Sequence, residues 1–158
     1  MELTQNPSVL ELVRKTAELT TPKEIVWIDG SEAQLESLRK IAVETGELIK
    51  LNEEKLPGCY LNRSDVNDVA RVEGRTFICS RTREEAGPTN NWMDPDEMKA
   101  KLHEILRCAM AGRTMYVIPY SMGVIGSPFA KYGIEVTDSI YVVLNMAIMT
   151  RWRGPSFP

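Results

Sequence analysis

One run of the sequence, residues 25–52, constrains the fold more than any other because its periodicity changes twice. The apolar run Ile25 to Ile28 predicts a strand. Ser31 and Gln34 then stand at capping-box spacing, ahead of an apolar helical stripe through Leu35, Leu38, Ile41 and Ala42. The run ELIKLN, residues 47–52, predicts a second strand. The order strand, helix, strand is typical of an α/β protein.

The rest of the chain continues this mixed pattern. Asn6 and Pro7 form a start signal for an N-terminal helix. The segment 53–73 is rich in turn formers and acids, so we expect a long loop there. A strand is expected over 75–80. An aspartate cap followed by proline predicts a helix over 94–111, with its end near a glycine.

The C-terminal part contains the clearest strand pattern, RTMYVIP at 113–119. A shorter strand is expected at 132–136, after a loop rich in glycine and proline. The segment 137–150 has two interpretations: its Thr-Asp-Ser start predicts a helix, and its Tyr-Val-Val run predicts a strand. We favour the helix. The chain as a whole predicts an α/β fold, a single mixed α/β lobe with a mixed sheet flanked by helices.

Composition excludes several classes of protein. A formal net charge of −3 and a pI near 5.3 argue against a nucleic-acid partner, because a protein that binds nucleic acid needs a basic face. The apolar runs are too short to span a membrane, and the first residues lack a secretory pattern, so we expect a cytoplasmic protein. The cysteines, Cys59, Cys79 and Cys108, are too widely spaced to suggest a disulfide framework or a zinc site, and we expect reduced, partly buried thiols.

The residues that could carry chemistry are few. Neither GxxxxGK[ST] nor GxGxxG occurs, so we expect no nucleotide site of those kinds. The single histidine, His103, falls on the charged face of the 94–111 helix and is expected to be a surface residue. Asp94 and Asp96, and similarly Asp65 and Asp68, are more typical of helix caps and turns than of a paired-carboxylate site.

Two features have open alternatives. Arg71 ends the polar loop just before a strand, where its guanidinium could bind a carboxylate or phosphate, or could pair locally with Asp68 or Glu73. The loop 120–133 offers amides and hydroxyls, through Ser121, Gly123, Gly126 and Ser127, that could cradle a small anion. The same residues can simply turn the chain between two strands, and composition favours that interpretation.

Three long motifs resemble one family. They are GRTMYVIPYSMGVIGSPFAKYGIEVTDSIYVVLNMAIMTR, YLNRSDVNDVARVEGRTFICS and AGPTNNWMDPDEMKAKL. All three resemble the amino-terminal lobe of the GTP-dependent phosphoenolpyruvate carboxykinases, and the last two its bacterial branch. The similarity runs from about residue 25 to residue 151. After Arg151 the chain departs from the family pattern and reads WRGPSFP, and Ala147 stands where the pattern has arginine.

The resemblance implies that residues 1–158 are an incomplete amino-terminal domain of a two-lobed enzyme, without its nucleotide-binding carboxy-terminal domain. Such an enzyme converts oxaloacetate and GTP to phosphoenolpyruvate, GDP and CO₂ with Mn²⁺, in gluconeogenesis. The resemblance also implies that Arg71, in the DVAR motif, binds oxaloacetate or phosphoenolpyruvate. The family's catalytic, nucleotide and metal residues have no counterpart here, so we expect no catalytic or metal-binding residue, no bound GTP or Mn²⁺, and no activity in the isolated chain. Two alternatives are a stand-alone small-anion or partner module and a nonfunctional gene remnant.

Overall fold

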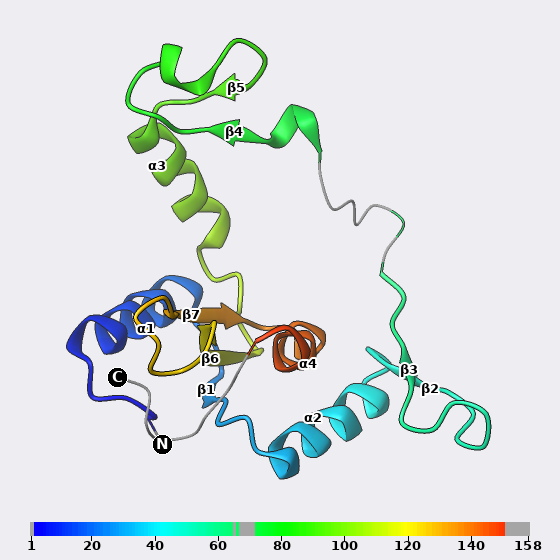
Figure 1. Ribbon diagram of the computed structural model, residues 1–158. Coiled ribbons are helices and arrows are strands. Elements are labelled where there is room, and N and C mark those ends of the chain that lie inside the picture. The colour runs from blue at the N-terminus through cyan, green and yellow to red at the C-terminus, as the bar shows by residue number, and fades with distance from the viewer. Residues whose placement is uncertain (1, 65, 67–71, 151–158) are drawn as a thin grey trace.

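A three-stranded mixed sheet forms the centre of the protein in the computed structural model, which describes residues 2–64, 66 and 72–150 (Figure 1). Strand β6 (Thr114–Met122) lies in the middle. Strand β1 (Glu24–Trp27) pairs with it in parallel, and β7 (Lys131–Thr137) pairs with it antiparallel on the other side. The predicted α/β fold with a mixed sheet flanked by helices is confirmed.

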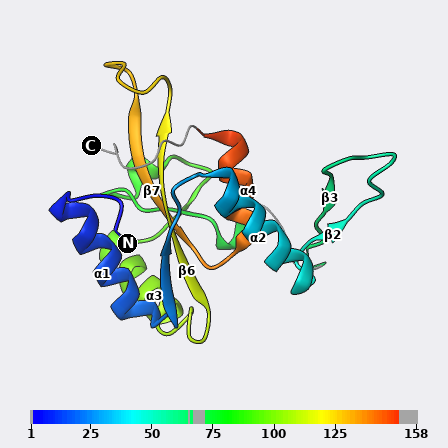
Figure 2. The ribbon, with the colours of Figure 1, turned by 90° about the horizontal axis from the view of Figure 1, so that it is seen from below.

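The core lies on both faces of this sheet, and the side chains of β6 alternate between them. Met115 and Val117 pack on the face covered by α1 (Pro7–Thr20). Tyr116 and Ile118 pack on the opposite face, against α2 (Glu32–Glu44) and α4 (Ile140–Met149), and Figure 2 shows these helices on the two sides of the sheet. Burial on both faces explains why β6 reads as a continuous apolar run.

The predicted capping signal at Ser31 starts α2, but Gln34 acts differently from a capping-box glutamine. The Ser31 hydroxyl accepts a hydrogen bond from the Gln34 amide N–H at 3.3 Å. The Gln34 side chain reaches the end of β1 instead: its Oε1 accepts from the Asp29 N–H and its Nε2 donates to the Trp27 carbonyl, both at 2.9 Å. One side chain therefore joins the start of α2 to the end of β1.

The segment 137–150 contains helix α4, as predicted, and the N-terminus of this helix is held by a residue far away in the sequence. Ser139 caps α4. Glu47 Oε1 accepts hydrogen bonds from the Ser139 hydroxyl at 2.8 Å and from the Tyr141 N–H at 2.9 Å. A carboxylate at this end of a helix satisfies free N–H groups and interacts favourably with the helix dipole.

Glu47→Ala should therefore destabilise the domain by about 1–2 kcal/mol, because it removes both hydrogen bonds at the start of α4. Urea denaturation followed by circular dichroism measures the change. Glu54→Ala is the matched control, because the exposed Glu54 side chain makes no ion pair or hydrogen bond within the described part of the chain. Equal midpoints for the two variants would contradict the role of Glu47.

Two predicted strands do not join the central sheet. Strand β2 (Ile49–Lys50) forms a small antiparallel pair with β3 (Tyr60–Leu61), which lies inside the expected loop. Strand β4 (Phe77–Ile78) pairs in parallel with β5 (Asn91–Trp92), which the sequence did not predict. Short 3₁₀ turns η1 (Glu73–Arg75) and η2 (Glu84–Ala86) flank β4 in the chain. Each predicted strand is therefore only two residues long, with one neighbour.

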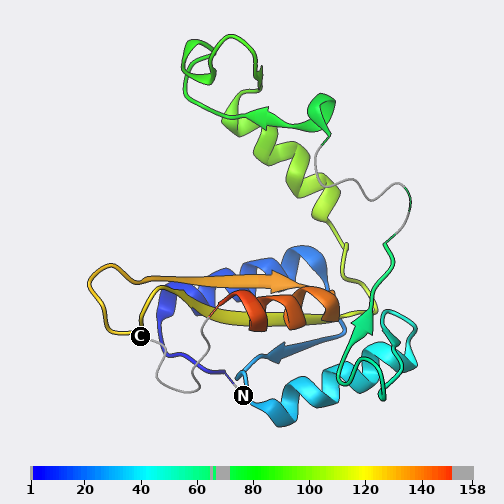
Figure 3. The same cartoon turned by 45° about the vertical axis from the view of Figure 1, so that its right-hand side comes forward.

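Helix α3 (Pro95–Leu106) begins at the predicted Asp94 cap but ends earlier than residue 111. The backbone after Leu106 bonds to the end of α1: Cys108 N–H donates to the Leu19 carbonyl at 2.9 Å and Met110 N–H to the Thr20 carbonyl at 3.0 Å. These tertiary bonds replace the helical ones and lead the chain into β6. Together, η1, β4, η2, β5 and α3 project away from the central sheet (Figures 1 and 3).

No helix in the described ranges is both long enough and apolar enough to cross a membrane.

Candidate functional site

The predicted substrate-binding residue, Arg71, lies outside the described residues, as do Asp65 and Asp68. The residue that follows it, Val72, is described and leads directly into the turn η1. The Val72 carbonyl accepts hydrogen bonds from the Arg75 N–H at 3.0 Å and from the Thr76 hydroxyl at 2.8 Å. The chain immediately after Arg71 is therefore held in a defined turn.

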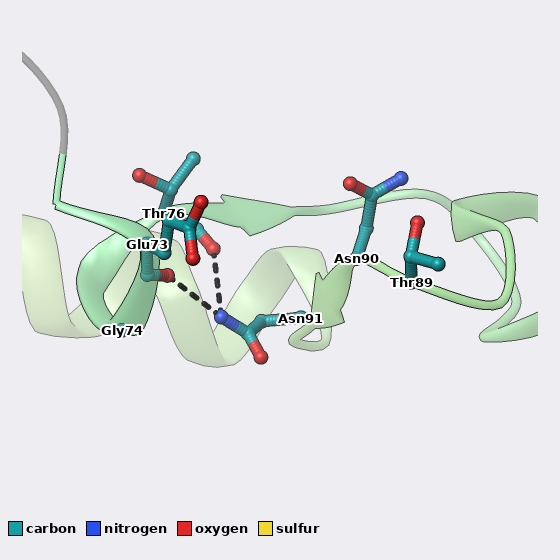
Figure 4. Close-up of a pocket in the computed structure, with 6 residues that line it drawn as sticks. All are labelled: Glu73, Gly74, Thr76, Thr89, Asn90 and Asn91. Atoms are coloured by element: carbon teal, nitrogen blue, oxygen red, sulfur yellow. Dashed lines mark hydrogen bonds between the residues drawn. The ribbon is translucent and has the colours of Figure 1, made fainter.

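A polar groove of about 570 Å³ lies beside this turn (Figure 4). It is formed between η1 and the loop that enters β5, and all its residues are exposed. The groove is lined by Glu73, Gly74, Thr76, Thr89, Asn90 and Asn91. Its side chains are amides, hydroxyls and one carboxylate. Such a lining can hydrogen-bond a small polar ligand, but it brings no cation of its own to an anion.

Asn91 holds the two walls of this groove together. Its Nδ2 donates hydrogen bonds to the Glu73 carbonyl at 2.8 Å and to the Thr76 carbonyl at 3.2 Å, as the dashed lines in Figure 4 show. The sequence separations are 18 and 15 residues. Sequence reasoning missed this role, since the run TNN carries only the signal of a turn.

The β4–β5 pair gives Asn91 a defined position. Phe77 lies opposite Asn91 and Ile78 opposite Trp92 in parallel register. The Trp92 Nε1–H donates to the Ser80 carbonyl at 3.0 Å, and the Met93 N–H donates to the Ile78 carbonyl at 3.3 Å. A pair of strands this short gains stability from such additional bonds, because its own ladder offers few.

The loop 120–133 is a hairpin connection, and the structure favours the turn interpretation over the anion cradle. Ser121 belongs to β6 and is only 3% exposed, so its hydroxyl cannot face a ligand in solvent. The Gly126 N–H donates to the Tyr132 hydroxyl, the Ser127 N–H to the Val124 carbonyl, and the Phe129 N–H to the Ser127 hydroxyl. These three amides are thus used within the loop.

The other residues that the sequence singled out lie on the surface or cap a helix. His103 is exposed on α3, as predicted, and Asp94 accepts from the Asp96 and Glu97 N–H groups as a helix cap. All three cysteines are exposed, so the expectation of partly buried thiols is wrong. Leu102, Ile105 and Leu106 of α3 are also exposed, and no residue of this helix is buried.

No cluster of three or more His, Cys, Asp or Glu residues suited to a metal ion occurs among the residues that the structure describes. The groove contributes only one carboxylate, Glu73. A divalent cation that is held by the protein alone takes several oxygen, nitrogen or sulfur ligands from it. The described residues therefore do not fit a Mn²⁺ site.

Comparison with known proteins gives the family. Residues 11–157 match the family model of the phosphoenolpyruvate carboxykinase N-terminal domain, a longer range than the 25–151 of the motifs. The chain is 56% identical over 148 residues to the phosphoenolpyruvate carboxykinase [GTP] of Corynebacterium kroppenstedtii, and 53% identical over 146 residues to that of Neocallimastix frontalis. For the enzyme of Anaeromyxobacter dehalogenans strain 2CP-C the identity is 54% over 148 residues.

These matches cover 92–94% of this chain but only 24–25% of each relative. The chain thus spans about a quarter of the length of the curated relatives that it matches. A family model that covers residues 11–157 takes in all the described helices and strands except the start of α1. The chain therefore belongs to the phosphoenolpyruvate carboxykinase family, whose N-terminal domain it matches.

Proposed function

We propose that residues 1–158 serve as the amino-terminal, substrate-binding part of a GTP-dependent phosphoenolpyruvate carboxykinase. The complete enzyme would convert oxaloacetate and GTP to phosphoenolpyruvate, GDP and CO₂. The observation that carries this proposal is the match of residues 11–157 to the family's N-terminal domain, together with relatives at 53–56% identity. The name of each relative specifies GTP, and GTP is accordingly the proposed phosphoryl donor.

The substrate contact that we assign to this chain is Arg71. Oxaloacetate carries two carboxylates, and phosphoenolpyruvate a carboxylate and a phosphate. A guanidinium binds either group through two parallel N–H···O hydrogen bonds, a geometry that lysine cannot provide. The polar groove lined by residues 73, 74, 76 and 89–91 begins two residues after Arg71 in the sequence, and its amides and hydroxyls can hydrogen-bond a small polar ligand. We further propose that the nucleotide and Mn²⁺ bind in the part of the enzyme that this chain does not span.

The isolated chain should bind GTP no more tightly than millimolar and should not turn over oxaloacetate, because it has no phosphate-binding motif among its residues. Calorimetric titration with GTP and Mn²⁺, and an assay of oxaloacetate loss with both present, measure the two properties. Micromolar affinity, which corresponds to about −8 kcal/mol, would contradict the proposed division between the two parts of the enzyme. Conversion of oxaloacetate to phosphoenolpyruvate by the chain alone would also contradict it.

The proposed function can be measured in a fusion enzyme, in which the present chain replaces the matching quarter of the C. kroppenstedtii carboxykinase. The remaining three quarters of the fusion enzyme come from that relative. The 56% identity over 94% of the chain makes the exchange a conservative one. Substrate and nucleotide kinetics can be separated in this fusion enzyme. We further propose a cytoplasmic location for the complete enzyme.

A further inference from the structure

We propose that the outer edge of β7 (Lys131–Thr137) pairs with a further strand, supplied by the part of the carboxykinase that this chain does not span. The inference rests on the proposed function above. In the order β1-β6-β7, strand β7 is the last strand, so it has a neighbour on one side only among the described strands. An added strand forms backbone hydrogen bonds with the other side of β7.

The position of Pro119 identifies the backbone groups of β7 that face this outer edge. In an antiparallel pair, residues opposite each other alternate between hydrogen-bonded and non-hydrogen-bonded pairs. Pro119 has no N–H and lies opposite Ile134, and Val117 lies opposite Val136, so both pairs are of the non-hydrogen-bonded kind. The Val117 carbonyl agrees with this alternation, because it accepts from the Ile28 N–H at 2.9 Å, on the side of β1. The N–H and C=O groups of Ile134 and Val136 therefore point away from β6.

These outward groups form an open strand edge. Within the part of the chain that the structure describes, no turn, loop or side-chain hydrogen bond uses the backbone N–H or C=O of Ile134 or Val136. Strand β7 is seven residues long and contains no proline. None of its residues is buried, whereas most residues of β6 are. A long edge with free backbone groups is a template for pairing with another strand.

The two faces of β7 indicate the chemistry of the strand that fits beside it. Ile134 and Val136 pack against the buried cluster that contains Val117, on the face covered by α1. Lys131 and Glu135 occupy the alternate positions of β7, on the opposite face. An added strand continues the sheet if it places apolar side chains on the α1 face and polar side chains on the other.

The tip of the β6–β7 hairpin adds an apolar surface at the start of β7. Met122, Val124 and Phe129 are 62%, 68% and 86% exposed, and Figure 2 shows the tip extending beyond α1 and α4. No charged residue occurs between Arg113 and Lys131 in the sequence. The loop is held by its own hydrogen bonds, so these side chains are presented in a defined arrangement. Clustered apolar side chains of this kind mark a surface for another part of a protein.

The length of the relatives favours the rest of the enzyme as the source of the strand. The matches cover only 24–25% of each relative, so a complete carboxykinase has about three quarters of its chain outside the present one. The other possible source is β7 of a second copy of this chain, because an open edge can also pair with its own copy. The two sources predict different hydrogen-exchange results.

Hydrogen exchange at four neighbouring amides of β7, measured by mass spectrometry with residue-level fragmentation, tests the proposal. In the isolated chain, the Gly133 and Glu135 amides should be protected, because their positions alternate with Ile134 and face β6. The Ile134 and Val136 amides should exchange rapidly. In the fusion enzyme, exchange at Ile134 and Val136 should slow by about a hundredfold or more. Gly133 and Glu135 are the matched control in the same strand, since they should be protected in both proteins.

Rapid exchange at Ile134 and Val136 in the fusion enzyme would overturn the proposal, and turnover of oxaloacetate by that enzyme would still support the proposed function. Slow exchange in a fusion enzyme without turnover would support the added strand and contradict the proposed function alone. Protection of Ile134 and Val136 in the isolated chain would also overturn the proposal. If that protection rises with protein concentration and light scattering gives the mass of a dimer, the strand comes from a second copy.

Discussion

Arg71→Ala is expected to lower kcat/KM for oxaloacetate by about ten- to a hundredfold in the fusion enzyme. A charge-assisted hydrogen bond to a carboxylate or phosphate contributes about 1.5–3 kcal/mol, and this variant removes it. Arg71→Lys should fall between arginine and alanine, because it keeps the charge and loses the fork. Steady-state kinetics are measured with oxaloacetate varied at saturating GTP and with GTP varied at saturating oxaloacetate. The two series give kcat/KM for oxaloacetate and kcat/KM for GTP separately.

The competing explanation for Arg71 is a local ion pair with Asp68 or Glu73. It predicts a different result: a lower melting temperature and unchanged kinetics for the folded fraction. The control is Arg107→Ala, because Arg107 is an exposed arginine just after α3 and no described ion pair includes it. A loss of stability in Arg71→Ala alone, without loss of turnover, would return Arg71 to a structural role.

Ile118→Ala should have the largest effect on stability, a loss of about 3 kcal/mol. Ile118 is fully buried at the centre of β6, where it packs in the cluster formed with α2 and α4. The substitution leaves a cavity between the sheet and two helices. Urea denaturation of the chain measures the free energy of unfolding, and a change of this size is a large part of the stability of an ordinary domain.

Ile148→Ala is the control for this prediction, since the residue type and the substitution are the same. Ile148 lies on α4 and is 83% exposed, so its truncation should change the free energy of unfolding by less than about 0.5 kcal/mol. Similar losses for the two variants would show that the buried cluster around Ile118 does not form as described.

The central sheet was predictable because its strands carry strong local patterns. The apolar run of β6 and the capping signals of α1, α2 and α4 all correspond to elements of the structure. The strand β6 continues past the predicted end at Pro119 to Met122. This is possible because β1 pairs only as far as Val117, so Pro119 lies beyond the stretch where β6 has a neighbour on that side.

The part that projects from the central sheet, η1 to α3, was less predictable because tertiary contacts determine where its elements begin and end. The end of α3 depends on hydrogen bonds to Leu19 and Thr20, which lie about 90 residues earlier, and no glycine or proline marks Leu106 as the last residue. The strands of the β4–β5 pair are two residues long, which is too short for any periodic pattern. Apolar residues of α3 such as Leu102 and Ile105 look like a core stripe in the sequence but are exposed.

Some features of the candidate site could be predicted from the sequence and others could not. Arg71 emerges from the sequence only through its motif and the family resemblance, and its role stays a prediction. The groove between η1 and the loop that enters β5 could not be predicted, and neither could the hydrogen bonds of Asn91, because they join residues 15 and 18 positions apart through side-chain to backbone contacts. The anion-binding interpretation of the loop 120–133 looked open in the sequence. It lost support once the strand pairing showed a hairpin, with Ser121 buried in β6.

The turnover of oxaloacetate by the unsubstituted fusion enzyme tests the central claim most directly. With GTP and Mn²⁺ present, we predict release of CO₂ and formation of phosphoenolpyruvate with kcat/KM within about tenfold of the parent C. kroppenstedtii enzyme. The same parent lacking its matching quarter should be inactive, because the whole proposed substrate-binding part is gone. A fusion enzyme that is folded, binds GTP and still fails to convert oxaloacetate would contradict the claim that this chain is the substrate-binding part of a carboxykinase.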